Sequence, residues 1–123
     1  SALGHNYAEF KSNLMEGLDG VDKITLFDKS KVGRQVAAEV KNFDPTLHFD
    51  SRKDLPYLDK YCQFALVSSR EAAKSSFLDI KRHSEEIGVC FGTGIGGVGT
   101  IESSYRRLFE DKSPRLPPFT LPR

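Results

Sequence analysis

The sequence predicts an α/β fold, because helical and strand-like segments alternate along it. Three segments carry apolar residues at helical spacing, and two shorter segments between them have the residue pattern of strands. A glycine-rich turn, "GTGIGG", joins the last of these strands to the last helix. The chain has 123 residues and no evident internal repeat. We therefore expect one segment, residues 1–123, without an internal domain boundary.

The first half of the chain is expected to hold one helix followed by extended segments. Asn6 can cap a helix that ends near Leu18, where "EGLDG" interrupts the pattern. The apolar residues at helical spacing are Tyr7, Phe10, Leu14 and Leu18. Residues 23–28 form a short extended piece, and residues 34–43 alternate apolar and polar side chains as a strand does. Two prolines place residues 44–57 in a loop.

The second half is expected to hold a helix, a strand and a second helix. Residues 59–75 have a helical pattern whose first half is apolar on nearly every side, so we expect this helix to be buried. A polar connection, 79–86, leads to residues 87–92, an apolar run typical of a strand covered on both faces. The helix after the glycine turn has one apolar stripe: Val98, Ile101, Tyr105 and Leu108. The tail, 113–123, has four prolines in eleven residues, which excludes a helix or a central strand.

The composition limits the classes of partner. Apolar residues make up 38% of the chain and charged residues 28%, as in a soluble globular protein. The formal net charge is +1, so no long-range field would attract nucleic acid or an anionic membrane. No apolar stretch approaches the ~18 residues of a membrane span. We expect a cytoplasmic protein with neither nucleic acid nor membrane as a partner.

The cysteines and histidines do not form the pattern of a metal site. Cys62 and Cys90 lie in apolar segments, and we expect both thiols to be buried. His5 and His83 are in polar turns and His48 is in the proline loop, so we expect all three to face solvent. Because no metal-ligand spacing connects these five residues, we expect neither a metal nor a cofactor.

The glycine turn raises the question of what it holds. Residues 92–97 match the G-x-G-x-x-G pattern of dinucleotide sites, which also need an acidic residue about 20 positions further on, at the end of a second strand. The sequence there is "LPPFTLPR", with no acid and no strand pattern, so dinucleotide binding is not favoured. Two interpretations stay open: the glycines pack tightly against another surface, or Gly96 and Gly97 expose backbone amides at a helix N-terminus.

Five motifs occur in an order that resembles a known family. They are "SALGHN", "GLDGVDKITLFDKS", "VKNFDP", "FGTGIGGVGTIE" and "PPFTLP". In this order and spacing the chain is similar to the N-terminal part of an elongating β-ketoacyl-acyl-carrier-protein synthase of the synthase II type. The resemblance covers essentially the whole chain. It implies the N-terminal portion of a thiolase-like α/β fold, whose first strand and catalytic part would lie outside residues 1–123.

The resemblance gives the glycine turn a role other than phosphate binding. In such synthases the turn lies beside the active-site cavity, and its isoleucine lines the tunnel for the growing acyl chain. This implies that Ile95, flanked by Gly94 and Gly96, is an acyl-pocket residue. The "PF" stretch implies that Phe119 and Thr120 lie at a dimer interface and reach toward the partner's acyl pocket. Close relatives have phenylalanine where Thr120 stands, so this end of the pocket is expected to differ in shape.

The resemblance also shows which catalytic groups fall outside the sequence. Family members continue to a nucleophilic cysteine, two histidines and a lysine, and condense an acyl chain with malonyl-carrier protein. Cys62 is expected in the middle of a helix and Cys90 within a strand. Neither place suits a reactive thiolate, which needs a helix N-terminus or a nearby cation. We therefore expect an acyltransferase segment that contains no catalytic residue and is inactive alone, as a fragment, a split-gene product or a cleaved piece.

The resemblance further implies an acyl carrier protein as partner and a homodimer in the complete enzyme. Carrier proteins are acidic, and Lys53 and Arg115 match basic family positions that meet them. Other basic positions of the family are Pro56, Tyr57 and Pro114 here, so docking is expected to be weakened or rearranged. The alternative for Lys53 and Arg115 is that they are ordinary solvated charges.

Two rival functions come from other classes. The chain could be a non-catalytic partner of the chain-length-factor type, or a decayed remnant, and the presence of a nucleophilic cysteine within the next ~40 residues, about the length of one βαβ unit plus a turn, would decide this. It could also be a nucleotide-binding module, which binding of NAD would reveal. The motifs do not distinguish fatty-acid from polyketide synthesis, and they do not fix the acyl chain length.

Overall fold

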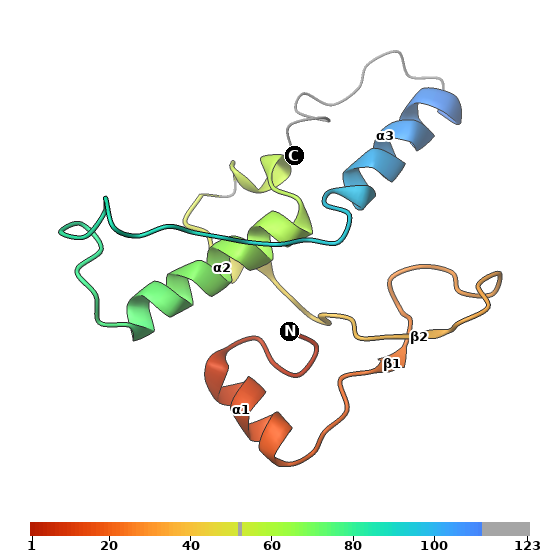
Figure 1. The fold of residues 1–123 in the computed structure, drawn as a ribbon. Coiled ribbons are helices and arrows are strands. Elements are labelled where there is room, and N and C mark those ends of the chain that lie inside the picture. Colours follow the sequence, from red (N-terminus) through yellow and green to blue (C-terminus); the bar gives the residue numbers. More distant parts are fainter. Residues whose placement is uncertain (52, 112–123) are drawn as a thin grey trace. The chain divides into compact units, whose positions relative to one another are not determined.

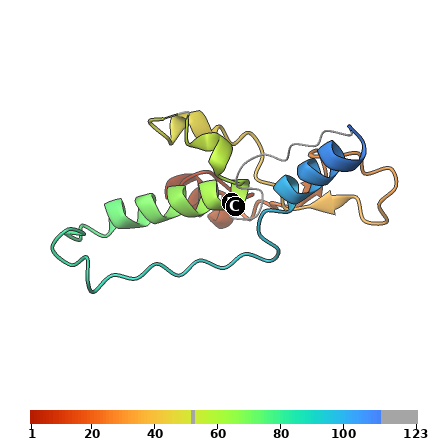
Figure 2. The ribbon, with the colours of Figure 1, turned by 90° about the horizontal axis from the view of Figure 1, so that it is seen from above.

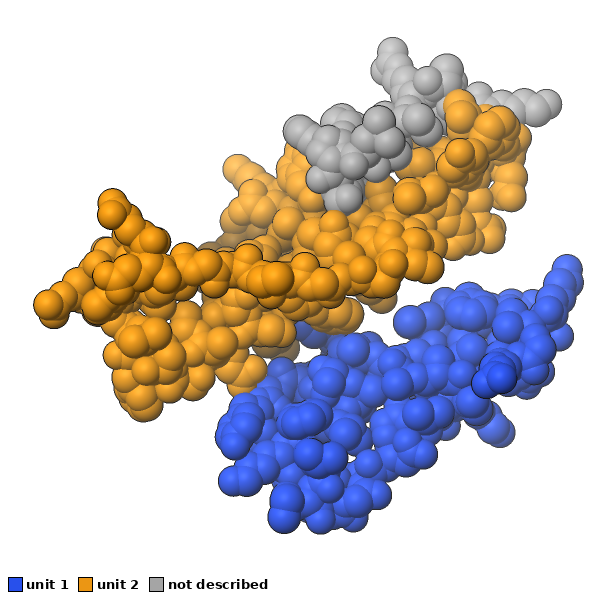
Figure 3. Space-filling view, viewed as in Figure 1, with its two compact units in different colours: residues 1–44 blue, residues 45–123 orange. Residues whose placement is uncertain are grey.

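The structure is a computed structural model that describes residues 1–51 and 53–111. The chain divides into two compact units, Ser1–Asp44 and Pro45–Arg123 (Figure 3). Helices and strands both occur, as the sequence predicts (Figure 1). Two compact units can belong to one domain, so the expected single segment stays a prediction.

Helix α1, Tyr7–Met15, begins at the predicted cap. The Asn6 side chain accepts a hydrogen bond from the Glu9 N–H at 2.9 Å, and the Glu9 carboxylate accepts one from the His5 N–H at 2.9 Å. This reciprocal arrangement satisfies backbone donors that the helix itself cannot. The helix ends three residues before the predicted Leu18, because Gly17 takes a left-handed φ of 71° and closes the last turn.

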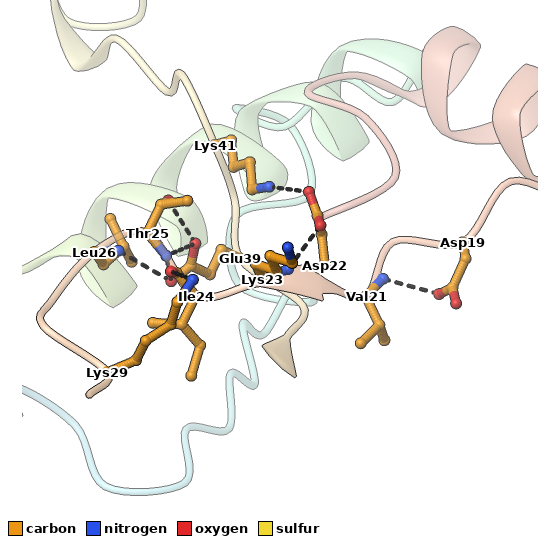
Figure 4. A network of polar contacts seen from close by, with 10 residues as sticks. All are labelled: Asp19, Val21, Asp22, Lys23, Ile24, Thr25, Leu26, Lys29, Glu39 and Lys41. Carbon is orange, nitrogen blue, oxygen red and sulfur yellow. Dashed lines mark hydrogen bonds and ion pairs between the residues drawn. The ribbon is translucent and has the colours of Figure 1, made fainter. Parts of the chain in front are cut away.

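Strands β1, Asp22–Lys23, and β2, Val36–Ala37, form an antiparallel pair in which Asp22 lies opposite Ala37. The predicted strand at 34–43 is thus much shorter than expected. The Glu39 carboxylate, two residues after β2, bonds to the segment that follows β1 (Figure 4). It accepts the N–H groups of Thr25 at 2.9 Å and Leu26 at 3.2 Å.

The same carboxylate is the best-satisfied polar group in this unit. Glu39 is buried, and the Thr25 hydroxyl donates to its Oε2 at 2.7 Å. This hydrogen bond, followed by those from the backbone N–H groups of Thr25 and Leu26, lowers the pKa of Glu39 below its ordinary value. At the other end of the pair, the Lys41 ammonium meets the Asp22 carboxylate at 2.6 Å (Figure 4). Contacts between Glu39 and Thr25 and between Lys41 and Asp22 therefore join the segments that flank β1 and β2.

Helix α2, Lys60–Ser75, matches the predicted helix, and two short 3-10 helices, Pro45–Leu47 and Leu55–Tyr57, interrupt the predicted loop before it. The expected burial of α2 is wrong, because none of its residues is buried. Among the described residues, the buried apolar side chains are Ile24 and Phe49 alone. Too little apolar surface from the described chain packs on α2 to cover it.

The predicted strand at 87–92 is also wrong. Figures 1 and 2 show the connection between α2 and α3 as chain without helix or strand. Val89 is 76% exposed and Phe91 is half exposed. A strand needs a neighbouring strand to bond its backbone groups, and no described segment pairs with this one. For the same reason the expected burial of Cys90 is wrong, since it is exposed, while Cys62 is half-buried.

Helix α3, Val98–Phe109, begins directly after the glycine turn, as predicted. Its apolar stripe is open: Ile101 and Tyr105 are both exposed, and the Tyr105 ring stacks on Phe109 with centroids 5.5 Å apart. None of the helices in the described part of the chain has the length and apolar character needed to span a membrane.

Candidate functional site

The glycine turn has the backbone geometry that its sequence indicates. Gly96 has φ +76°, a left-handed conformation that favours glycine, and its N–H is bonded to the Thr93 hydroxyl at 3.2 Å. Gly97 is the N-cap of α3, and its carbonyl accepts from the N–H groups of Thr100 and Ile101, both at 3.1 Å. The turn thus reverses the chain and starts the helix within four residues.

Asp59 joins this turn to the other helix of the unit. It precedes α2 as its N-cap, but its side chain makes no hydrogen bond to that helix. Instead, Asp59 Oδ1 accepts a hydrogen bond from the Thr100 hydroxyl in the first turn of α3. One carboxylate therefore lies at the N-termini of two helices, where the partial positive charge of each favours it.

Gly97 fits against the same carboxylate. A Cβ atom at Gly97 would collide with Asp59 Oδ2. This oxygen is buried and has no hydrogen-bond partner among the described residues. The Ser104 hydroxyl, one turn beyond Thr100 on α3, is likewise buried and without a partner in the described chain. The junction is therefore tightly packed but incompletely bonded.

A pocket of about 330 Å³ opens at this junction. One side is formed by residues 58–61 and Gln63 at the start of α2, and the other by Gly96, Gly97, Gly99, Thr100 and Ser103. Its walls combine large side chains from the start of α2 with glycine backbone and small polar side chains from the turn and α3. Gly97 is the turn glycine that approaches Asp59 closely, which agrees with the close-packing interpretation at that position.

Ile95 stands at the tip of the turn, between Gly94 and Gly96, and is 81% exposed. No residue that the structure describes encloses it in a tunnel. Its role as an acyl-pocket residue stays a prediction. Phe119 and Thr120, the other predicted acyl-pocket residues, lie outside the described residues.

Lys53 is exposed just before the 3-10 helix that contains Pro56 and Tyr57. Its backbone N–H donates to the Ser51 hydroxyl at 3.2 Å, and its ammonium group forms no ion pair within the described ranges. An exposed ammonium group without an ion pair is compatible with docking to an acidic partner. It is equally compatible with an ordinary solvated charge. Arg115, the second predicted docking residue, lies outside the described residues.

The position of Cys62 corrects one step of the sequence argument. Because α2 begins at Lys60, Cys62 lies in the first helical turn rather than in the middle of the helix. The hydrogen bond between Cys62 and Tyr61, more than any other effect, raises the pKa of the Tyr61 hydroxyl. A thiol in the first turn of a helix can be reactive, because the helix N-terminus stabilises the thiolate. The prediction that Cys62 is not a nucleophile therefore needs a direct test. Cys90 lies in an exposed segment without helix or strand.

The described residues that line the junction pocket include no histidine. His5 is exposed, as predicted, and its ring contacts the Lys41 carbonyl at 2.7 Å. His48 and His83 are half-buried rather than fully exposed, and His83 Nδ1 lies 3.3 Å from the Glu86 carboxylate. In the described part of the chain, no three His, Cys, Asp or Glu side chains are grouped as metal ligands would be.

Sequence reasoning missed Asp59 and Thr100. An aspartate directly before a helical pattern is a recognisable N-cap signal. That signal points to the helix that follows it, α2, whereas the hydrogen bond goes to a residue 41 positions away. No local pattern predicts such a contact, because it depends on how two helices pack.

Comparison with known proteins gives one family. The model of the β-ketoacyl synthase N-terminal domain matches residues 1–120. The 3-oxoacyl-[acyl-carrier-protein] synthase 2 of Staphylococcus aureus is 36% identical over 99% of this chain and 30% of its own length. The protein of the same name from Coxiella burnetii (strain RSA 493 / Nine Mile phase I) is 38% identical, with the same coverage. The chain therefore spans 30% of the length of these relatives.

Proposed function

The chain belongs to the β-ketoacyl synthase family as an N-terminal domain, and we propose that it forms the N-terminal part of a condensing enzyme that elongates acyl chains. The observation that carries the proposal is the family match over residues 1–120, which includes the first four motifs and the "PPFT" of the fifth, in the order that the sequence shows. Relatives that carry the name 3-oxoacyl-[acyl-carrier-protein] synthase 2 support an acyl carrier protein as the partner.

The proposed reaction is a decarboxylative Claisen condensation. A cysteine thiolate attacks the acyl thioester, forms an acyl-enzyme and expels the carrier-protein thiolate, which takes up a proton from water. Malonyl-carrier protein then loses CO₂, and the electron pair of the broken bond forms an enolate. Its carbon attacks the acyl-enzyme, and collapse of the tetrahedral oxyanion returns the cysteine thiolate and gives the β-ketoacyl product. Hydrogen-bond donors stabilise the oxyanion. We place the nucleophile and these donors in a part of the enzyme other than residues 1–123.

Within this enzyme the glycine turn would form part of the acyl-tunnel wall. Gly94 and Gly96 have no side chain, so Ile95 is the bulky group that the turn presents. An exposed Ile95 at the end of a well-defined turn supports the proposal, since a gate residue needs space on one side and a fixed backbone on the other. Phe119 and Thr120 would extend this wall at the interface of a homodimer.

The open apolar surfaces support a larger, thiolase-like fold. Val89 and Phe91 are exposed in a run of residues with strong strand propensity. We propose that further protein of the complete enzyme covers these exposed side chains. The open stripe of α3 would be covered in the same way.

The carrier-protein dock would include Lys53 and Arg115. Lys53 is exposed and without an ion pair in the described structure, so it is available to an acidic surface. Replacing Lys53 with glutamate in the complete enzyme should raise the KM for acyl-carrier protein and leave kcat unchanged, because docking affects encounter more than chemistry. The matched control is Lys74→Glu, at the far end of α2. Equal KM values for the two variants would mean that Lys53 is an ordinary solvated charge.

The decisive experiment is a condensation assay on the reconstituted full-length enzyme that contains this chain. We expect β-ketoacyl-carrier protein to form from an acyl donor and malonyl-carrier protein. No product, together with copurification of the chain with a separate active synthase, would favour the non-catalytic, chain-length-factor type of subunit. Saturable binding of NAD at the glycine turn would instead favour a nucleotide-binding module.

A further inference from the structure

We propose that Asp59 is a positioning residue for Ile95: its carboxylate holds the glycine turn against the start of α2 and so fixes where the acyl gate stands. The inference rests on the proposed role of Ile95. It concerns Asp59, which lies outside the five family motifs, and Thr100, which lies within the fourth motif but received no role from it.

The first argument is the hydrogen bond across the junction. Asp59 Oδ1 accepts from the Thr100 hydroxyl, and Thr100 is the third residue of α3. Thr100 is only 7% exposed, so water competes weakly for this bond. The bond links the residue before α2 to the helix that the glycine turn starts, and therefore limits how far the turn can move.

The second argument is the close approach of Gly97. Its φ of −80° is one that alanine adopts without strain, so the backbone alone does not require glycine here. What excludes a side chain is the Asp59 carboxylate, which lies where the Cβ atom would be. Glycine at this position therefore leaves the space that the Asp59 carboxylate occupies.

The third argument is the freedom of the turn itself. Glycine occupies positions 94, 96 and 97, and Gly96 has a left-handed φ. Such a segment has many conformations available unless another group restrains it. A gate residue whose place depends on a permissive turn needs an anchor nearby, and Asp59 is the side chain that contacts both the turn and α3.

Two helix N-termini strengthen this anchor. Helices α2 and α3 have 16 and 12 residues, and the Asp59 carboxylate lies at the start of both. The positive ends of the two helix dipoles attract the same negative charge. An uncharged replacement that keeps the acceptor oxygen, Asp59→Asn, should therefore weaken the anchor less than Asp59→Ala, which removes both the oxygen and the charge.

The structural test is a double-mutant cycle on the thermal unfolding of the reconstituted full-length enzyme. Gly97→Ala should force the carboxylate away from Thr100 and lower the melting temperature. In the Asp59→Ala background the same substitution should have little further effect, because nothing remains for the new Cβ to collide with. Additive effects of the two substitutions would overturn the proposed contact.

The functional test asks whether Asp59 fixes Ile95. Ile95→Phe should lower kcat/KM for long acyl donors relative to short ones by about tenfold. In the Asp59→Ala background we expect this penalty to fall below about threefold, because an unanchored turn lets the larger side chain move aside. If Asp59 had a purely structural role, Asp59→Ala would lower kcat/KM equally for long and short acyl donors. The tenfold penalty of Ile95→Phe on long donors would then remain in the Asp59→Ala background, and this result would overturn the proposal.

Matched variants separate the explanations. Thr100→Ser keeps the hydroxyl and should preserve the long-to-short ratio, whereas Thr100→Val removes the donor and should behave like Asp59→Ala. Asp54→Ala is the control, since Asp54 is the N-cap of the 3-10 helix Leu55–Tyr57 and, like Asp59, makes no side-chain capping bond to the helix that follows it. If Ile95→Phe shows no chain-length effect even in the wild-type background, the proposed role of Ile95 fails. The unfolding cycle then still decides whether Asp59 anchors the turn.

Discussion

Glu39 and Asp59 are two carboxylates, one in each unit, that hold turns in very different ways. Glu39 accepts hydrogen bonds from the Thr25 hydroxyl and from the N–H groups of Thr25 and Leu26, no more than 14 residues away. Asp59 accepts one hydrogen bond, from Thr100, 41 residues away, and its second oxygen has no partner within the described residues. The first contact is local and complete, and the second is distant and half-satisfied.

The apolar side chains do not follow this division, because Leu26, Phe27 and Val36 of the first unit are exposed as well. Ile24 is buried beside the Glu39 network, and the Lys29 ammonium donates to its carbonyl at 2.8 Å. Around the Asp59 junction, Ile95, Ile101 and Tyr105 are exposed. A buried polar group without a hydrogen-bond partner lowers the stability of a fold, and so does a large exposed apolar surface. A polar network in which every group is bonded carries no such penalty. The two units therefore differ in hydrogen bonding: Asp59 keeps an unsatisfied oxygen within the described residues, whereas both oxygens of Glu39 are bonded.

The largest effect we expect is the absence of condensing activity in the 123-residue chain alone. We predict that residues 1–123 contain no nucleophile paired with oxyanion donors, whereas the reconstituted enzyme would have both. Incubation with acyl- and malonyl-carrier proteins, followed by detection of β-ketoacyl product, checks this. Cys62→Ser with Cys90→Ser is the control, since Cys62 lies in the first turn of α2. Turnover that survives this double substitution would contradict the family-based mechanism.

The second expected effect is on folding. Because the stripe of α3 and the apolar run at 87–92 are open, we expect the isolated chain to be oligomeric, aggregation-prone or partly molten. Sedimentation velocity over a range of concentrations, combined with near-ultraviolet circular dichroism, measures this. A sharp melt of a monomer that does not depend on concentration would show that residues around Asp59 need no partner, and would remove the contrast between the two units.

The third expected effect is the chain-length selectivity of Ile95→Phe in the reconstituted enzyme. Adding volume to a packed site costs about 1–3 kcal/mol, which corresponds to roughly 5- to 150-fold in an equilibrium. The loss should fall on long acyl donors, which need the gate open, and spare short ones. Acylation rates with donors of both lengths provide the measurement, with Ile101→Phe on α3 as a matched control. Equal losses for both lengths would place Ile95 in an ordinary core.

What the sequence predicted well depends on neighbours within one or two helical turns. The three helices and the N-cap Asn6 follow from local spacing, and the positive φ of Gly96 follows from a glycine-rich turn before a helix. The prediction of a strand at 87–92 was wrong because an apolar run does not indicate whether a neighbouring strand is present to pair with it. The candidate site was found only in part, since its glycines form a motif, whereas the bond from Asp59 to Thr100 exists only in three dimensions.

The smallest effect we expect concerns the pH dependence of the Glu39 network. Hydrogen bonds from Thr25 and Leu26 lower the pKa of Glu39 below its ordinary value. A carboxyl with a lowered folded-state pKa stabilises the fold above its unfolded-state pKa, about 4.3 for glutamic acid. That contribution is lost as the pH falls from there through the lower folded-state pKa. Acidification should therefore loosen the turn at Thr25 and Leu26.

Hydrogen exchange measured by mass spectrometry on peptides that cover residues 24–39 tests this, after correction for intrinsic exchange rates. Asp22 and Asp28 in the same unit also have lowered pKa values, so acid alone does not isolate Glu39. Glu39→Gln should lose protection at pH 6 and show a flatter pH dependence than the wild-type chain, because the amide cannot gain or lose the charge. Glu85→Gln, at an exposed position in the second unit, is the matched control and should match the wild-type chain. An unchanged pH dependence in Glu39→Gln would mean that the two aspartates, and not Glu39, set the acid response of this turn.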